Sequence, residues 1–476
     1  MTSKGSFPFS LRHLVKGSAL YGSADVAVAG ARFLLIALYT RIMTPAEFGL
    51  FSIITTTVTL AVVFIPLGIP SAVMLKMNTA DPLGSRACKD GALSFLFQIC
   101  LVAGVAFYLV SLLAFPGTLI RELSPWLILW ALSDVCGMIP KVSLRIKEKI
   151  AAFSAAKIVR LMIMVLLLVS LLHSGVKGIT AVIVAESLSS IAEWIVCMIL
   201  DRYVPAQFSF SCLPALLRVG MPLTFVALGM FCIDLSDRYV IFGLLGNQAN
   251  GFYAAAAKVA VAASFFIEAF NSMWFPYYLR NVREGGGEMD DSLRRYASTL
   301  IVLFSVVISL FMLVLPTFVS LHLFGRYFIA QQYRCVTVLV APLTLAYFFK
   351  AAFYVSSTIL IAAGKNWKLA LTVYVAAGVN IGANLLWATV WAGRDVFYTL
   401  TGIALMTSVS YAVCMVLASR AAGLFNVRFW ATSRGAWLGA TALCLAFLPV
   451  PLVARFSAWT FIAGIACWKY LFVKRA

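Results

Sequence analysis

The sequence contains few charged residues. Asp, Glu, Lys and Arg together make up only 12% of its 476 residues, whereas 62% are hydrophobic. Soluble domains are about half apolar and about a quarter charged, so a water-facing surface cannot cover this many apolar side chains. The composition therefore excludes a soluble multidomain enzyme. It also excludes an intrinsically disordered chain, because disorder accompanies low hydrophobicity and high charge.

Motifs for catalysis and nucleotide binding are absent as well. No G-x-x-x-x-G-K-[ST] loop occurs, which argues against transport driven by ATP hydrolysis within this chain. The three histidines, His13, His173 and His322, begin neither an H-x-x-x-x-D nor an H-E-x-x-H pattern. We therefore predict no catalytic residue, no metal ligand and no cofactor.

The ten cysteines show no spacing that suggests a framework. None forms a C-x-x-C pair, and most lie within apolar runs, for example Cys100, Cys136, Cys197, Cys232, Cys414 and Cys444. Disulfide frameworks and zinc sites need spaced thiols that face solvent. We therefore interpret the cysteines as small apolar packing residues.

Long apolar runs take up most of the chain. A bilayer-spanning helix needs about 20 residues, and the apolar windows, separated by charged residues, Pro or Gly, predict fourteen such spans. Their approximate ranges are 17–39, 50–75, 91–115, 123–140, 152–173, 178–200, 215–236, 252–276, 297–320, 335–362, 368–391, 397–420, 434–454 and 456–473. They leave no room for a sizeable extramembrane domain, so we predict an all-α, multi-pass integral membrane protein.

A short internal repeat predicts two related halves. Gly49 lies in Arg41–Phe51 after the first span, and Gly251 lies in Gly246–Tyr253 after the seventh span. Six spans separate these segments, and an even number gives both halves the same orientation, with a cavity between them. We predict a six-helix lobe at 1–205, a second six-helix lobe at 206–422 in parallel repeat, and two additional helices at 423–476.

Basic residues outnumber acidic residues by 37 to 18, which gives a formal net charge of +19. They are scattered singly between apolar runs, so they indicate membrane topology and not a nucleic-acid site. Loops on the side of the N-terminus contain 24 Lys and Arg, and loops on the other side contain 8. Because cytoplasmic loops carry the excess of basic residues, we predict that both termini are cytoplasmic.

Charged side chains within the spans are candidate functional residues, because ionisable groups in hydrocarbon are costly and normally face a cavity or a partner. We predict that Arg32, Lys258 and Lys350 form a cationic substrate-binding cavity. Residues on the same helical stripes are predicted to line it: Tyr21, Asp25 and Tyr39 with Arg32, and Tyr347 and Tyr354 with Lys350. A cationic cavity implies an anionic ligand, commonly a phosphate. Structural pairing with other helices is the alternative.

Two acidic residues of the sixth span, Glu186 and Glu193, share a helix face with two serines. They either pair with Lys157 or Arg160 of the fifth span or bind a coupling ion or proton. Both possibilities stay open from the sequence.

Other polar pairs are interpreted as structural. Asp234 and Arg238 are four residues apart and are predicted to form a local salt bridge. Asn380 and Asn384 are predicted to hold helices together. The adjacent G-x-x-x-G pattern that begins at Gly378 predicts close helix packing.

Three segments resemble a known family. Arg41–Gly49 is similar to the signature R-x-L-T-P-E-E-F/Y-G of bacterial lipid-linked oligosaccharide flippases. Asp237–Lys258 is similar to that family's D-R-x-x-L-G-x-x-x-G-x-x-x-x-G-x-Y-x-x-A stretch, and Gly364-Lys365 with Asn380 and Asn384 resembles its G-K…N-x-x-x-N region. These flippases form the polysaccharide-transporter branch of the multidrug/oligosaccharidyl-lipid/polysaccharide exporter superfamily.

The resemblance implies a protein of the bacterial inner membrane that carries out no covalent chemistry. It would move undecaprenyl-diphosphate-linked oligosaccharide units across the membrane by alternating access of two lobes, for O-antigen, capsule or exopolysaccharide export. Membrane lipid, a polysaccharide polymerase and a chain-length regulator are the partners that this function implies.

Two alternatives remain from the sequence. A cation-coupled multidrug exporter of the same superfamily would need acidic residues for cationic drugs, whereas the in-span cations suit an anionic cargo. A membrane enzyme of polysaccharide assembly would need a large external loop or a His/Asp motif, and the sequence contains neither.

Overall fold

The computed structural model of the chain describes residues 30–76, 82–114, 117–147, 149–202, 212–268, 291–323, 326–424 and 455–460, together with positions 28, 271, 274, 278 and 445. The predicted span 434–454 and most of the span 456–473 lie outside the described residues, apart from these few positions. Tyr21 and Asp25, which were predicted to line the cavity, also lie outside them.

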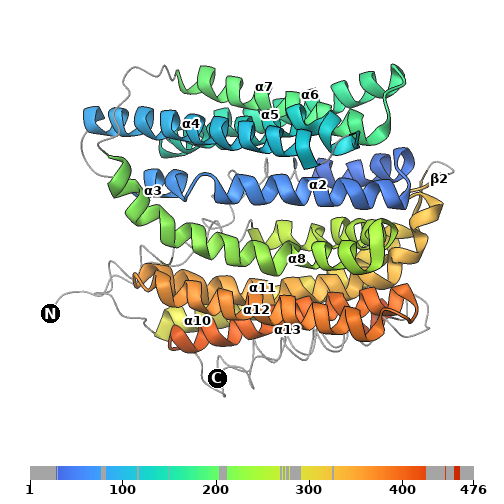
Figure 1. Cartoon of the computed structure of the whole chain (residues 1–476). Coiled ribbons are helices and arrows are strands. Elements are labelled where there is room, and N and C mark those ends of the chain that lie inside the picture. Colours follow the sequence, from blue (N-terminus) through green and yellow to red (C-terminus); the bar gives the residue numbers. More distant parts are fainter. Residues whose placement is uncertain are drawn as a thin grey trace.

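The described chain is almost entirely helical (Figure 1). A helix over residues 30–42 comes first. It is followed by α2 (Pro45–Phe64), α3 (Ile69–Lys76), α4 (Pro82–Ala114), α5 (Leu119–Ile146), α6 (Ile150–His173), α7 (Gly178–Asp201), α8 (Leu213–Ala260), α10 (Asp291–Val319), the strands β1 (His322–Leu323) and β2 (Arg326–Tyr327), the 3-10 helix η1 (Gln331–Val336), α11 (Thr337–Ala362), α12 (Asn366–Trp391) and α13 (Val396–Ala421). The two strands pair antiparallel as a small hairpin.

Nine helical segments of the described chain are long and apolar enough, by length and composition, to cross a membrane. They are Pro45–Phe64, Cys88–Leu113, Leu119–Ile146, Ala151–His173, Gly178–Asp201, Leu213–Ala260, Gln331–Ala362, Asn366–Trp391 and Val396–Ala421. The predicted all-α membrane fold is confirmed.

The longest element, α8, is two helices joined by a sharp bend. Gly246 has φ 84° and ψ 178°, values that no α-helix contains, and glycine adopts such positive φ angles without steric cost. The bend brings the chain back on itself, so that the Tyr253 hydroxyl donates to Asp237 over 2.5 Å. The predicted spans 215–236 and 252–276 correspond to the two arms of α8 and its continuation.

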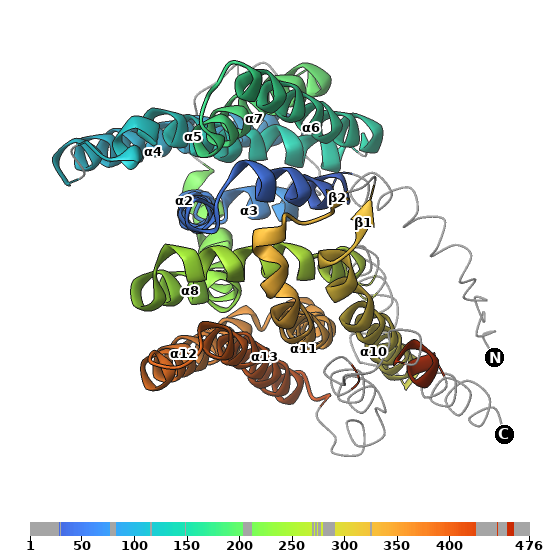
Figure 2. The ribbon, with the colours of Figure 1, turned by 90° about the vertical axis from the view of Figure 1, so that its right-hand side faces the viewer.

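The helices run side by side along a common direction in two groups (Figures 1 and 2). The helices α4 to α7 form one group, and α10 to α13 form the other. Between them lie α2, α3 and α8, and α2 packs extensively against α8. Segments from the two halves of the sequence therefore meet at the centre of the molecule.

The first residues of α2 explain why the helix begins there. Thr44 is the N-cap, and its hydroxyl accepts from the backbone N–H of Glu47 while the Glu47 carboxylate accepts from the backbone N–H of Thr44. This reciprocal capping box satisfies two backbone donors that a helix start leaves open. Pro45 follows at the first helical position, where its missing N–H costs nothing.

The two glycines of the predicted repeat contact each other. A Cβ added to Gly49 would lie 1.9 Å from the carbonyl oxygen of Asn247, and one added to Gly251 would lie 1.8 Å from that of Pro45. The Asn250 side chain donates to the Gly49 carbonyl over 2.8 Å. At this end of the molecule, only glycine allows the backbones of α2 and α8 to approach so closely.

The opposite end also joins the two halves. Gly68 and Gly220 approach so closely that a Cβ on Gly68 would lie 2.1 Å from the Gly220 carbonyl oxygen. Nearby, Cys88 of α4 and Cys212 at the start of α8 form a disulfide with Cα atoms 5.5 Å apart. The interpretation of all the cysteines as packing residues is therefore wrong for this pair, because segments 124 residues apart come together here.

Polar and small residues of α12 have different roles. Ser236 of α8 donates to Asn380 over 3.0 Å, so the prediction that an asparagine here holds helices together is confirmed for Asn380. The Asn384 amide donates over 3.1 Å to Asn380 of the same helix. The prediction of close packing at the G-x-x-x-G pattern is wrong. A Cβ on Gly378 or Gly382 would meet no described atom within 4 Å.

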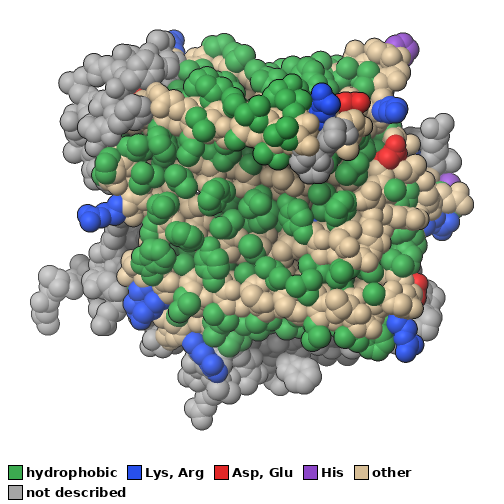
Figure 3. Space-filling model, in the orientation of Figure 1, with side chains coloured by type: hydrophobic (Ala, Val, Ile, Leu, Met, Phe, Trp, Pro, Cys, Tyr) green, Lys and Arg blue, Asp and Glu red, His purple; other side chains and the backbone are tan. Residues whose placement is uncertain are grey.

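The outer surface is apolar along the helices. Large side chains such as Val102, Leu166 and Leu386 are exposed, and hydrophobic side chains cover the broad face in Figure 3. Lys and Arg lie toward the two ends of that face (Figure 3). This distribution fits a lipid-facing band between two aqueous sides, as expected of a multi-pass membrane protein.

Candidate functional site

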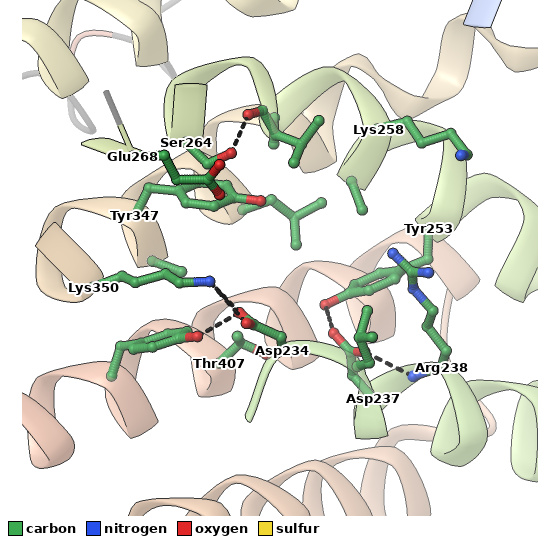
Figure 4. Close-up of a pocket in the computed structure, with 17 residues that line it drawn as sticks. Asp234, Asp237, Arg238, Tyr253, Lys258, Ser264, Glu268, Tyr347, Lys350 and Thr407 are labelled. Carbon is green, nitrogen blue, oxygen red and sulfur yellow. Dashed lines mark hydrogen bonds and ion pairs between the residues drawn. The ribbon is translucent and has the colours of Figure 1, made fainter. Parts of the chain in front are cut away.

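A cavity of about 350 Å³ lies among α8, its continuation to Glu268, α11 and α13 (Figure 4). Apolar and ionisable side chains both line it. The lining residues are Asp234, Leu235, Asp237, Arg238, Tyr253, Ala257, Lys258, Ala260, Val261, Ser264, Glu268, Leu343, Ala346, Tyr347, Lys350, Thr407 and Tyr411. The structure thus brings the predicted residues Lys258, Lys350 and Tyr347 together.

Lys350 is neutralised by Asp234. Its Nζ lies 2.9 and 2.8 Å from the two carboxylate oxygens of Asp234, and the Tyr411 hydroxyl donates to the same carboxylate. The pair connects α11 to α8, as Figure 4 shows. Lys350 is therefore not a free cation for a ligand in this conformation.

Arg238 has no carboxylate partner among the residues that the structure describes. The predicted salt bridge between Asp234 and Arg238 is wrong, because Asp234 faces α11 and pairs with Lys350. Arg238 donates instead from Nη1 to the Thr56 hydroxyl of α2 over 3.2 Å. Its Nε is buried without a hydrogen-bond partner in the described structure, so this guanidinium keeps an open donor.

Asp237 is occupied by neutral donors. It accepts from the backbone N–H of Arg238 over 2.8 Å and from the Tyr253 hydroxyl. The bend at Gly246 produces this contact, because it returns the second arm of α8 beside the first. The same bend places Lys258 and Arg238 on one side of the cavity (Figure 4).

Lys258 likewise forms no ion pair with any described residue. Its ammonium group lies 5.7 Å from the ring centroids of both Tyr39 and Phe51, which belong to the helix over 30–42 and to α2. Contacts between a cation and aromatic rings at about 6 Å are attractive, but they compensate only part of the cost of removing a charge from water.

The remaining predicted lining residues are more scattered. Tyr39 is buried beside Lys258. Tyr354 is partly buried on α11 and is not among the residues that line the cavity. Arg32 is exposed on the helix over 30–42 and is not among the residues that line the cavity.

A second ionic cluster lies within the first half of the chain. Arg160 of α6 contacts Asp134 of α5 over 2.7 Å and Glu193 of α7 over 2.9 Å. Lys141 of α5 also pairs with Glu193, at 2.8 Å. Glu186 is held more loosely, with 3.4 Å between its Oε2 and Arg160 Nη2. Pairing with Arg160, one of the two alternatives for the glutamates, therefore occurs.

Eight polar residues of the cavity were not predicted from the sequence as lining residues: Asp234, Asp237, Arg238, Tyr253, Ser264, Glu268, Thr407 and Tyr411. The predicted span 215–236 ends one residue before Asp237, whereas the helix continues to the bend at Gly246. Extending the span to that glycine would have placed both Asp237 and Arg238 inside the membrane region. Nothing in the sequence pattern marks the partners of Tyr253 and Tyr411.

The cavity contains three cations and three carboxylates, and two of the cations form no ion pair in the described structure. Arg238 and Lys258 are two cations without an ion pair, whereas Lys350 is paired and Asp237 accepts from neutral donors. Both cations also contact the first half of the chain, through Thr56 for Arg238 and through Tyr39 and Phe51 for Lys258. A ligand held by them would lie where the two halves meet.

Solved structures with a similar fold are transporters. The lipid II flippase MurJ in an inward closed conformation has a TM-score of 0.67 at 12% identity, over 95% of this chain and 99% of that chain. The eukaryotic MATE transporter AtDTX14 has a TM-score of 0.57 at 15% identity, over 92% and 99%. The Vibrio cholerae MATE transporter VcmN has a TM-score of 0.60 at 14% identity, over 90% and 99%. At these identities the likeness shows the fold alone.

Sequence comparison identifies the family. No curated protein matches the chain significantly. The family model for polysaccharide biosynthesis proteins matches residues 14–282, which is more than half of the sequence. That range includes the helices α2 to α8 and the two cations without ion pairs. The chain therefore belongs to the polysaccharide biosynthesis protein family, and its fold is that of the flippases and exporters of the multidrug/oligosaccharidyl-lipid/polysaccharide exporter superfamily.

Proposed function

We propose that the protein is a flippase for undecaprenyl-diphosphate-linked oligosaccharide units, which it moves from the cytoplasmic to the periplasmic leaflet of the bacterial inner membrane. The observation that carries the proposal is the presence of two cations without ion pairs, Arg238 and Lys258, in one cavity of a transporter fold. Export of O-antigen, capsule or exopolysaccharide would follow. The work is conformational, so no enzymatic step is proposed.

The chemistry of a diphosphate supports this assignment. A diphosphate that leaves water needs fixed cations to replace its hydration. Arg238 offers several donors in a planar fork that matches phosphate oxygens, and Lys258 adds a compact charge. Lys350 would bind the diphosphate as well only if its ion pair with Asp234 broke. Arg32, which is exposed, is proposed to attract the headgroup before it enters the cavity.

The position of the cations supports alternating access. We propose that segments 1–205 and 206–422 move as two lobes, with 423–476 as two additional helices. Arg238 and Lys258 contact residues of α2 and of the helix over 30–42, so a bound anion would influence the interface between the lobes. Both termini would be cytoplasmic, and a polymerase and a chain-length regulator would receive the transported units.

The test uses cells that lack the native protein and express Lys258→Ala. We expect lipid-linked units to accumulate on the cytoplasmic face, as in the deletion, while the amount of inserted protein stays near normal. Lys365→Ala is the matched control, because Lys365 is exposed in the turn between α11 and α12. Normal export by an inserted Lys258→Ala protein would refute the proposed role of the cavity.

A cation-coupled multidrug exporter is the second candidate. MATE transporters share the fold, and the carboxylates of Asp234 and Glu268 line the same cavity as the cations. This function predicts that deletion sensitises cells to cationic drugs without accumulation of lipid-linked units. Accumulation without drug sensitivity supports the flippase.

A further inference from the structure

The cavity that contains Arg238 and Lys258 has a second polar end. Glu268 and Ser264 line it from the helical continuation of α8. Together with Tyr347 of α11 they lie on the other side of the cavity from Lys258 and Arg238 (Figure 4). Ser264 and Glu268 follow Lys258 by six and ten residues, which corresponds to roughly 9 and 15 Å at a helical rise of about 1.5 Å per residue. The cavity therefore extends from a cationic end to an end with a carboxylate and two hydroxyls.

This second end, defined as Glu268, Ser264 and Tyr347 and called the acceptor end, is richer in hydrogen-bond acceptors than in donors. A carboxylate offers acceptors only, and the Glu268 side chain is exposed where it lines the cavity. The Ser264 hydroxyl already donates to the Val261 carbonyl over 2.8 Å, so its oxygen can only accept. A ligand group at this end must therefore supply several donors.

The two substituents of a lipid-linked diphosphate differ in what they can supply. A diphosphate held by Arg238 and Lys258 carries a prenyl chain on one phosphate and a sugar on the other. The prenyl chain has no donor, so placing it against the acceptor end would remove polar groups from water without replacing their hydrogen bonds, which is costly. A sugar ring presents several O–H donors. Of the two substituents, the sugar is the one that fits the acceptor end.

The size of the cavity limits how much of the glycan it can hold. Its volume of about 350 Å³ is near the lower limit of small-molecule pockets, which measure about 300–1,000 Å³. A diphosphate with one sugar ring would fill such a space, and the further sugars of an oligosaccharide would lie outside it. The cavity therefore contacts the sugar nearest to the lipid.

We propose that the acceptor end is a subsite for the sugar attached directly to the diphosphate. Glu268 accepts hydrogen bonds from the sugar hydroxyls, the Tyr347 hydroxyl forms a further one, and Arg238 and Lys258 hold the phosphates. Contacts at both ends select a sugar-bearing lipid over the bare lipid carrier, whichever sugars follow. The inference rests on the proposed function, because it requires a diphosphate at Lys258 and Arg238.

The experiment compares two kinds of probe with the purified, full-length protein. One is farnesyl diphosphate that carries glucose or galactose on its terminal phosphate, and the other carries a methyl group in place of the sugar, so the charge is the same. Isothermal titration calorimetry in detergent gives their dissociation constants. We expect the better sugar-bearing probe to bind the wild type about tenfold more tightly than the methyl probe, as one hydrogen bond to a charged group would give.

Two variants remove groups of the acceptor end. Glu268→Ala should lower the affinity ratio of the two probes to about one, and Tyr347→Phe, which deletes a single neutral hydroxyl, should lower it about threefold. Tyr354→Phe is the matched control, because this tyrosine belongs to the same helix but is not among the residues that line the cavity. The ratio compares two probes on one protein, so a general loss of affinity cancels.

The outcomes distinguish this inference from the proposed function. A wild type that binds the methyl probe as tightly as both sugar-bearing probes overturns the inference alone. A ratio that stays at about ten in both Glu268→Ala and Tyr347→Phe does so too, as does a ratio that falls as far in Tyr354→Phe. A wild type that binds none of the probes, or binds them no better than Lys258→Ala does, overturns the diphosphate site and the inference together.

Discussion

The ion pair that Asp234 forms determines which cations of the cavity remain available to a ligand. Lys350 contacts both carboxylate oxygens of Asp234, whereas Arg238, one helical turn from Asp234, keeps a buried donor without a partner. A ligand entering the cavity therefore meets Arg238 and Lys258 as free cations. Lys350 is available only at the expense of an existing ion pair.

Removal of Asp234 should destabilise the protein through Lys350. In Asp234→Asn the ammonium group of Lys350 loses its counter-charge. Breaking a fully buried pair costs about 3–5 kcal/mol, and the cost here should be smaller because the Asp234 side chain is 33% exposed. We expect a lower melting temperature for the purified variant. The double variant Asp234→Asn/Lys350→Met should regain most of the loss, because no unpaired charge remains. A single variant that melts with the wild type would show that the pair is not stabilising.

Substitution of Arg32 tests its contribution to substrate binding separately from its contribution to protein stability. Its side chain is exposed, so Arg32→Ala should leave protein amount and melting temperature unchanged. If Arg32 contacts the diphosphate headgroup on its way into the cavity, export should fall in this variant, and Arg32→Lys should restore it only partly because a lysine lacks the planar fork. Glycan export and protein level are measured in the same cells. Unimpaired export in Arg32→Ala removes this residue from the mechanism.

At the residue scale, the sequence could predict only a minority of the polar residues that line the site. Lys258, Lys350 and Tyr347 were found because a charge or a tyrosine on a helical stripe within an apolar run is unusual. Arg238 was assigned to a local salt bridge, since its spacing from Asp234 satisfies the rule for neighbours on a helix. The rule failed because Asp234 pairs with Lys350, which belongs to a different helix, α11. The periodicity of one helix contains no information about a partner on another.

At the scale of single elements, the start of α2 shows what the family-like motif does physically. In Arg41–Gly49 the threonine, proline and glutamate cap the helix, and the final glycine provides the close approach to α8. Arg41 itself donates from Nη2 to the carbonyl oxygen of Tyr327 over 2.9 Å. The motif thus fixes where α2 begins and how the two halves meet at this end.

Added methyl groups at the glycine contact should force α2 and α8 apart. A Cβ at Gly49 or Gly251 would overlap backbone atoms, which cannot move aside as a flexible side chain can. We expect Gly49→Ala and Gly251→Ala to lower the melting temperature by several degrees. Gly378→Ala is the matched control, because its Cβ meets no described atom and alanine favours a helix interior by about 0.5–1 kcal/mol. Equal melting temperatures for all three variants would show that the contact has no energetic importance.

At the scale of the whole molecule, the two halves are joined at both ends. At one end the Tyr333 hydroxyl donates to the Met43 carbonyl over 3.0 Å and Gln332 donates to the Thr40 carbonyl over 3.2 Å, beside the glycine contact. At the other end Gly68 meets Gly220 and a disulfide joins α4 to α8. Alternating access would require the glycine contacts at the two ends to separate in turn, whereas the disulfide keeps Cys88 beside Cys212 throughout.

The architecture was more predictable from the sequence than these contacts. Apolar runs and the spacing of Gly49 and Gly251 predict the helices and the repeat, because both are properties of local segments. The disulfide between Cys88 and Cys212 was missed, since it joins residues 124 positions apart. The sharp bend at Gly246 within α8 involves a single residue, as the helices and the repeat involve short segments. Its consequence is that Arg238 and Lys258 lie on one side of the cavity, and this is visible only in the folded structure (Figure 4).

The most direct test of the account is flipping by the purified protein in liposomes that contain a fluorescent undecaprenyl-diphosphate-linked oligosaccharide. The wild type should accelerate movement of the lipid between leaflets, and the double variant Arg238→Ala/Lys258→Ala should move it no faster than vesicles without protein. The same variant should retain helical content and insertion, because neither side chain has an ion-pair partner to lose in the described structure. Equal flipping by the variant and the wild type would contradict the account, as would a wild type that moves no lipid.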